Sequence, residues 1–137
     1  MNWGNTHWVG LLINLRLATI EIYDSYKTIA ETDQQVADHM EPLLVSLPWV
    51  MKRYLPAEIA DSISTAAYTW RRVDGIYQNL RSGDCGPCAM KFLEMHAAGI
   101  DVDDMGKLTD KDVDTFRAIY AMDCYEEFVG DPVVVNK

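Results

Sequence analysis

The chain has 137 residues, of which 49% are hydrophobic and 24% are charged. These proportions are those of a globular protein and exclude a fibrous or disordered chain. The length predicts a single domain, residues 1–137, large enough to bury a core. A net charge of −9 argues against nucleic acid as a direct ligand, because proteins that bind its phosphates need clustered lysine and arginine.

An apolar run near the N-terminus predicts neither a signal peptide nor a membrane helix. The run, 8–13, is too short to span a bilayer, and no basic residue precedes it. We therefore expect an intracellular protein with no membrane partner. Three cysteines, an odd number, favour free thiols in a reducing compartment over a disulfide framework.

The first part of the chain predicts an antiparallel β-hairpin. Apolar residues in 7–15 fall on both alternating faces, as in a strand covered on two sides, and 19–23 is a second β-favouring run. Only a short gap separates the two runs, which favours a hairpin. His7 begins the first strand and Asp24 closes the second, so the hairpin would bring both side chains to the same end of the sheet.

A helix and a third strand are expected next. Thr32 can N-cap a helix over 33–45, which Pro42 interrupts, and Pro48 then punctuates the region that follows. The segment 68–73 alternates aromatic, tryptophan and basic residues in the manner of a strand. The loop after this segment leads directly into Cys85.

Two helices are predicted in the last third of the chain. The segment 84–98 has apolar residues at helical spacing, and Gly99 stands where a C-cap glycine should be. Thr109 and Asp112 resemble a capping box at the start of a helix over 110–128. Strands followed by helices in this order indicate an α+β fold.

The cysteine at the start of the first of these helices has the setting of a nucleophile. The helix N-terminus favours the thiolate of Cys85, Pro87 is tolerated in a first turn, and Gly86 allows close approach by a substrate backbone. The Cys85 backbone N–H can be one donor of an oxyanion hole. If Asp24 accepts a hydrogen bond from Nδ1–H of His7, Nε2 can take the thiol proton. The sequence thus predicts a Cys85, His7 and Asp24 triad.

Three segments in this order resemble the ubiquitin-like-protein-specific (SUMO) protease family of the papain-like clan: His-Trp-Val at 7–9, Ile-Tyr-Asp-Ser at 22–25 and Gly-Asp-Cys-Gly-Pro at 83–87. Segments 77–79 and 91–96 are most similar to plant members, many of them transposon-encoded. The resemblance implies a papain-like α+β core, with a small mixed or antiparallel sheet and the nucleophile at a helix N-terminus. It implies no cofactor and no metal.

The same resemblance implies a cysteine peptidase or isopeptidase that cleaves after the Gly-Gly tail of a SUMO-type modifier, in precursors or conjugates, through a thioester. Trp8 would help to form a tunnel that only glycine residues can thread. The family's oxyanion glutamine stands six residues before the cysteine, where this chain has Asn79; Gln78, seven before, is favoured through a one-residue loop extension. Nuclear localisation is also implied by the family, although the chain has no basic targeting run.

The position of the histidine adds a second hypothesis. In the family, a sizeable N-terminal part with a second tunnel tryptophan precedes the catalytic histidine, which here is residue 7. We therefore expect the chain to be the C-terminal portion of such a catalytic domain. The alternative function is that of a catalytically inactive remnant that binds a modifier or another protein.

Two other interpretations of the cysteines are disfavoured. The segment 85–88, Cys-Gly-Pro-Cys, is also the thioredoxin redox tetrapeptide, but that fold needs a βαβ unit before it and a cis-proline after it, and the only later proline is Pro132. A lone Cys-x-x-Cys lacks the second ligand pair of a zinc site, and His96 and Cys124 stand at no recognised zinc spacing. We expect Cys88 and Cys124 to be buried helix residues.

Overall fold

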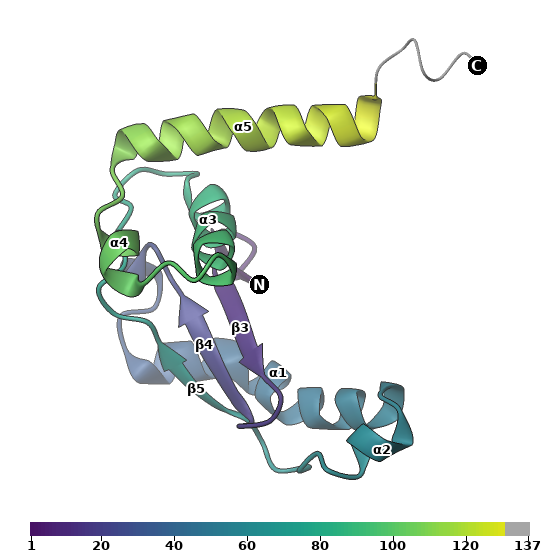
Figure 1. Ribbon diagram of the computed structural model, residues 1–137. Coiled ribbons are helices and arrows are strands. Elements are labelled where there is room, and N and C mark those ends of the chain that lie inside the picture. The colour runs from purple at the N-terminus through teal and green to yellow at the C-terminus, as the bar shows by residue number, and fades with distance from the viewer. Residues whose placement is uncertain (131–137) are drawn as a thin grey trace, which may run out of the picture.

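A three-stranded mixed sheet lies at the centre of the protein, in a computed structural model that describes residues 1–130. The strands are β3 (Gly10–Asn14), β4 (Thr19–Tyr23) and β5 (Thr69–Arg72), in this order across the sheet. The first two are antiparallel, as predicted for the hairpin, and β5 is parallel to β4. Helices cover both faces, so the α+β class is confirmed (Figure 1). The tail, 131–137, lies outside the described residues.

The predicted strand over 7–15 is in fact two strands. Its first residues form β2 (His7–Trp8), which pairs with a short strand, β1 (Asn2–Trp3), and the chain then enters β3. Gly4 and Asn5, both at positive φ, make the turn between β1 and β2. A Gly-Asn pair is a turn signal that the sequence carries, because both residues tolerate this backbone region. The small hairpin carries His7 at the end of the central sheet.

The long helix α1 (Asp33–Tyr54) begins where the sequence predicts. Thr32 accepts a hydrogen bond from the Gln35 backbone, and the Gln35 side chain bonds back to Thr32, which completes a capping box. The predicted end at residue 45 is wrong, since the helix continues through Pro42 and Pro48.

A tertiary hydrogen bond compensates for the second proline. Pro48 has no N–H to donate to the Leu44 carbonyl one turn earlier. The backbone N–H of Tyr68 donates to that carbonyl instead, at 3.1 Å. Because Tyr68 directly precedes β5, this bond also joins α1 to the start of the strand that completes the sheet.

On the other face lie α3 (Cys85–Ala97), α4 (Val102–Gly106) and α5 (Asp110–Val129). Gly99, at φ 74°, follows the end of α3, and Thr109 with Asp112 forms a capping box on α5, both as predicted. A Cβ at Gly10 would lie 3.0 Å from the Ala89 carbonyl, so α3 packs directly on the start of β3. The short elements η1 (Lys27–Ile29) and α2 (Ala57–Ala60) flank α1 in the chain.

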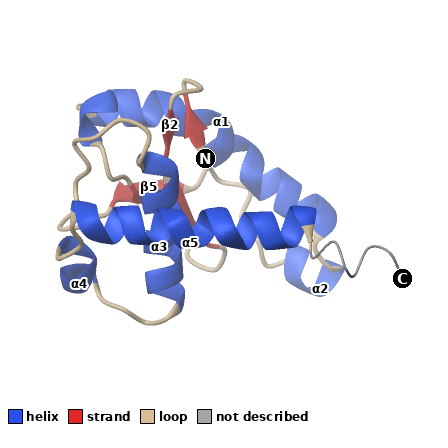
Figure 2. Ribbon diagram, turned by 90° about the horizontal axis from the view of Figure 1, so that it is seen from above, coloured by secondary structure: helices blue, strands red, loops and turns tan. Residues whose placement is uncertain are grey.

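Two hydrophobic clusters hold these layers together, one on each face of the sheet. Figure 2, from above, shows α5 crossing over α3. The cluster under α1 comprises Trp3, Val9, Ile20, Ile22, Ala30, Val36, Met40 and Tyr68. The cluster under α3, α4 and α5 comprises Tyr23, Val73, Ile76, Cys88, Phe92, Met105, Val113 and Phe116.

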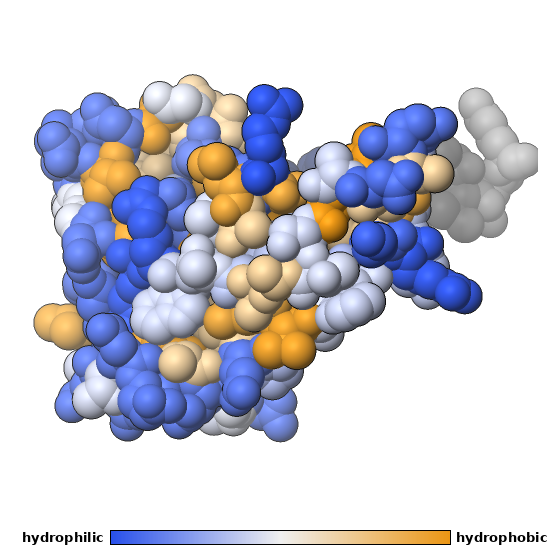
Figure 3. Space-filling model, turned by 90° about the horizontal axis from the view of Figure 1, so that it is seen from below, coloured by the Kyte–Doolittle hydropathy of each residue, from blue (hydrophilic) through white to orange (hydrophobic). Residues whose placement is uncertain are grey.

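The surface mixes hydrophilic and hydrophobic side chains, as Figure 3 shows from below. Exposed apolar residues include Leu17, Val45 and Phe128. Single exposed apolar side chains are ordinary on a folded domain.

Cys88 is buried as predicted, but the prediction for Cys124 is wrong, because its face of α5 points to solvent. Among the described residues, no helix combines the length and the apolar character that crossing a membrane requires.

Replacing Phe92 by alanine tests whether α3 is held by the second cluster. Phe92 is 0% exposed and packs on Tyr23, so we expect Phe92→Ala to lower the free energy of unfolding by about 3–5 kcal/mol. The control Met90→Ala, on the exposed face of the same helix, should change it by less than about 0.5 kcal/mol. Urea unfolding measures both, and equal values for the two variants would contradict the assignment of this cluster.

Candidate active site

His7 and Asp24 meet at the end of the sheet, as the predicted hairpin requires. Nε2 of His7 lies 2.8 Å from Oδ1 of Asp24, and the two side chains are 2% and 0% exposed. The prediction that Nδ1 faces the carboxylate is wrong. The Cys85 sulfur lies beside the backbone of β2, and Nδ1 is the ring nitrogen nearer the main chain. Because Nε2 bonds the carboxylate, Nδ1 is the ring nitrogen left for the thiol.

Further contacts hold the Asp24 carboxylate in place. Oδ1 also accepts the backbone N–H of Tyr26, at 2.9 Å, and Oδ2 forms an ion pair with Nη2 of Arg72, at 3.3 Å. Burial opposes ionisation of Asp24, but the hydrogen bonds from His7 and Tyr26 and the charge of Arg72 outweigh it and lower its pKa. Sequence reasoning missed Arg72, although it stands in the strand-like segment opposite Ile22.

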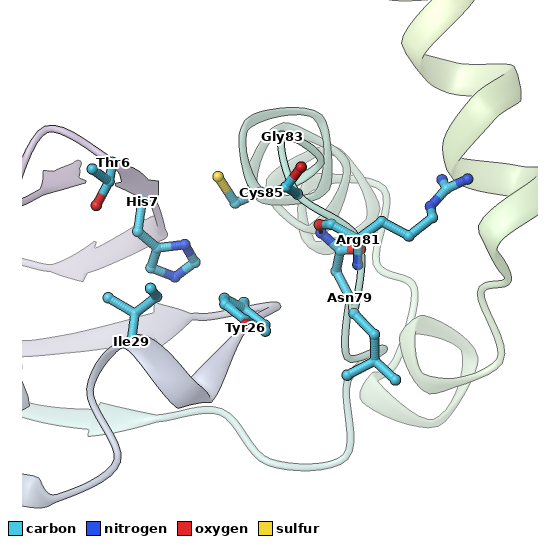
Figure 4. Close-up of a pocket in the computed structure, with 10 residues that line it drawn as sticks. Thr6, His7, Tyr26, Ile29, Asn79, Arg81, Gly83 and Cys85 are labelled. Atoms are coloured by element: carbon cyan, nitrogen blue, oxygen red, sulfur yellow. Dashed lines mark hydrogen bonds between the residues drawn. The ribbon is translucent and has the colours of Figure 1, made fainter.

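Cys85 is the first residue of α3, and its sulfur lies on the side of the helix that faces β2, the strand that carries His7 (Figure 4). The backbone N–H of Trp8 donates to the sulfur at 3.4 Å, a contact that sequence patterns do not reveal. This donor and the helix N-terminus both favour negative charge on the sulfur. The structure thus brings together all three residues predicted for the triad.

A cavity of about 280 Å³ opens between these side chains. His7 and Tyr26 stand on one side of it, and the loop that precedes α3 stands on the other (Figure 4). Cys85 and His7 therefore border the same cavity. Its lining residues are Thr6, His7, Tyr26, Ile29, Asn79, Leu80, Arg81, Ser82, Gly83 and Cys85.

The two amides proposed for the oxyanion hole lie in different places. Asn79 is 1% exposed and lines the cavity; its Nδ2 donates to the Arg81 carbonyl at 2.7 Å. Gln78 does not line the cavity, and its Nε2 donates to the Asp24 carbonyl at 3.1 Å. The placement therefore favours Asn79, the alternative, over Gln78.

Trp8 borders a second cavity, on the other side of the site. Its side chain is 50% exposed, and its Cδ1 would lie 3.7 Å from a Cβ added at Gly86. The residues around this apolar cavity are Met1, Trp8, Val9, Gly10, Leu11, Gly86, Ala89, Met90 and Leu93.

The other cysteine of the Cys-x-x-Cys motif has a different environment. Cys88 is 0% exposed, and burial is the main cause that raises its pKa to about 11. A buried thiol that resists ionisation is poorly suited to disulfide exchange, which needs a thiolate. Among residues 1–130, no three His, Cys, Asp or Glu side chains gather in a way that could hold a metal ion.

Comparison with known proteins gave one match. The model of a family described as the Ulp1 protease family, C-terminal catalytic domain, matches residues 1–131. The searches of curated proteins and of solved structures found no match.

Acid titration tests the lowered pKa of Asp24. A carboxyl whose pKa is lower in the folded state than its ordinary 3.8 stabilises the protein above that pH, and the contribution is lost as the pH falls through the folded value. The wild type should therefore lose more unfolding free energy than Asp24→Asn between about pH 5 and about pH 2. Urea unfolding across this range measures the gap, and a gap independent of pH would contradict the lowered pKa.

Proposed function

Because the chain belongs to the Ulp1 protease family, whose members are cysteine proteases, we propose that it cleaves after the Gly-Gly tail of a SUMO-type ubiquitin-like modifier. The observation that carries the proposal is the arrangement of His7, Asp24 and Cys85 around one cavity. Precursors and conjugates of the modifier are both proposed as substrates, because each presents an amide bond after the tail.

In the proposed mechanism Cys85 is the nucleophile and His7 is the general base and acid. Nδ1 of His7 takes the thiol proton, and the thiolate attacks the carbonyl carbon of the terminal glycine. His7 then returns the proton to the departing amine as the tetrahedral adduct collapses to a thioester. Water, deprotonated by His7, hydrolyses the thioester and frees the thiol. Asp24 keeps the ring orientation and stabilises the imidazolium.

The oxyanion of the tetrahedral adduct needs donors that are already in position. We assign one to the backbone N–H of Cys85, at the start of α3. For the second, Asn79 is better supported than Gln78, because Asn79 lines the cavity and its amide has a further hydrogen beyond the one given to the Arg81 carbonyl. To act as an oxyanion donor, the Gln78 side chain would have to break its hydrogen bond to the Asp24 carbonyl.

Selection for glycine is proposed to come from Trp8. Its half-exposed ring stands beside the nucleophile, and Gly86 leaves open the space next to it. A chain passing between this ring and α3 would have little room for side chains. The tail of a ubiquitin-like modifier, which ends in two glycines, meets that condition.

A relationship within the family and a cellular location are proposed from the sequence alone. Segments 77–79 and 91–96 support a relationship to plant, transposon-encoded members of the family. The resemblance to the family also supports localisation in the nucleus, where the protein would meet conjugates of the modifier.

An activity-based probe tests the proposal. A SUMO-type modifier with a C-terminal electrophile should form a covalent adduct with the wild type, and Cys85→Ala should abolish it. His7→Ala removes the general base and should slow adduct formation by about 10²-fold or more. Intact-protein mass spectrometry measures the rate, and Cys124→Ser, at an exposed position far along α5, is the control that should leave it unchanged.

The opposite outcome would point to the second hypothesis. A folded chain that binds the modifier but forms no adduct would identify a binding module rather than a protease. Circular dichroism on the same samples shows whether each variant is folded, so loss of the adduct through unfolding is recognised as such.

A further inference from the structure

Asp84, the residue before the nucleophile, occupies the N-cap position of α3 but does not cap it. The N-cap residues of α1, α4 and α5 (Thr32, Asp101 and Thr109) have extended backbones, and each side chain accepts a hydrogen bond from its helix. Asp84 instead has φ −93° and ψ −9°, and its side chain makes no capping bond. Since aspartate is among the best N-cap residues, its carboxylate must be engaged elsewhere.

Two arginines hold the Asp84 carboxylate, whose side chain is 3% exposed. Nε of Arg81 lies 2.8 Å from Oδ2, and Nη2 of Arg117, from α5, contacts Oδ1. The same Nη2 donates to the Gly83 carbonyl at 3.0 Å. Each oxygen is thus engaged by an arginine, one from the loop before α3 and one from α5, and neither caps the first turn of α3.

Arg81 is itself fixed at both ends. Its Nη2 forms an ion pair with Asp114 at 2.9 Å and donates to the Asp110 carbonyl at 3.2 Å, both on α5. Its backbone N–H and carbonyl bond the Asn79 side chain, at 2.8 Å and 2.7 Å. The contacts therefore join the loop that lines the active-site cavity to α5.

The position of the carboxylate decides what the start of α3 can bind. Pro87 has no N–H, so an Asp84 carboxylate in the capping position would accept from Gly86. It would place a negative charge beside the sulfur and the proposed oxyanion. Among the described residues, no hydrogen bond takes up the backbone N–H of Cys85 or Gly86. These donors stay free for the anions of the reaction.

We propose that Arg81 and Arg117 are positioning residues that hold the Asp84 carboxylate away from the N-terminus of α3 and so preserve its backbone donors for Cys85 chemistry. The role deepens the protease function proposed above, but the reactivity of the thiol can be measured without any modifier. Besides the start of α3, the groups near the thiol are the His7 imidazole, the Tyr26 ring and the Trp8 N–H. The charged and titratable groups around Arg81 are Asp110, Asp114 and Tyr77.

The test is the rate at which iodoacetamide alkylates Cys85 as a function of pH, in a Cys124→Ser background. With Arg117→Gln, Asp84 keeps only its contact with Arg81, and Oδ1 can turn toward the first turn of α3. The pH midpoint should then rise and the rate at neutral pH should fall about threefold, the size of a helix-terminus charge effect. Arg71→Gln is the matched control, because it removes the same charge from an ion pair with Glu21 on the sheet. It should leave the profile unchanged.

A second substitution separates positioning from general damage. An asparagine in place of Asp84 cannot carry the charge, so adding Asp84→Asn to Arg117→Gln should return the midpoint to the wild-type value. A wild-type midpoint in folded Arg117→Gln, or a raised midpoint that Asp84→Asn fails to restore, would overturn the proposal. If Arg117→Gln does not fold, Arg81→Gln with the same second substitution decides in its place. Normal thiol profiles without a modifier adduct would instead count against the protease function alone.

Discussion

A carboxylate with no exposed surface must be held by donors and opposite charge, and Asp24 has both. The His7 ring, the Tyr26 N–H and the Arg72 guanidinium converge on it from three parts of the chain. Leaving such a group unpaired would cost several kcal/mol, on the order of 3–5. The carboxylate therefore connects three parts of the chain: the β1–β2 hairpin, the turn that follows β4, and strand β5. It also orients the imidazole that faces the cavity.

Packing of α3 on the face of the sheet opposite α1 places Cys85 next to His7 and Asp24. Gly10 lets α3 approach β3 closely, which places the first residue of the helix beside Trp8. The backbone N–H groups in the first turn of α3 then lie close to the sulfur. They remain unoccupied as long as Arg81 and Arg117 hold the Asp84 carboxylate. The site thus combines a buried pair supplied by strands with a thiol supplied by a helix, and the sheet sets their relative position.

Local patterns predicted much of this arrangement. The hairpin, the N-cap at Thr32 and the capping box of Thr109 with Asp112 were predictable because residues close together in the sequence decide them. Two of the errors concern partners distant in sequence. The prediction for α1 missed the Tyr68 N–H that takes up the Leu44 carbonyl left by Pro48, and the prediction for the His7 ring missed that the Cys85 sulfur lies beside the β2 backbone. The spacing of apolar residues along the chain does not reveal such long-range contacts. The β1–β2 turn at residues 4–5, by contrast, carried a readable Gly-Asn signal.

The proposed chemistry of Cys85 depends most on the direction in which the His7 ring faces. Its tautomer can be measured directly by ¹⁵N NMR of histidine-labelled Cys85→Ala protein, under conditions where the imidazole is neutral. The hydrogen bond to Asp24 predicts a proton on Nε2 and a bare Nδ1, ready to receive the thiol proton in the wild type. A proton on Nδ1 would mean that the ring is turned the other way, and it would contradict the proposed roles of Asp24 and His7.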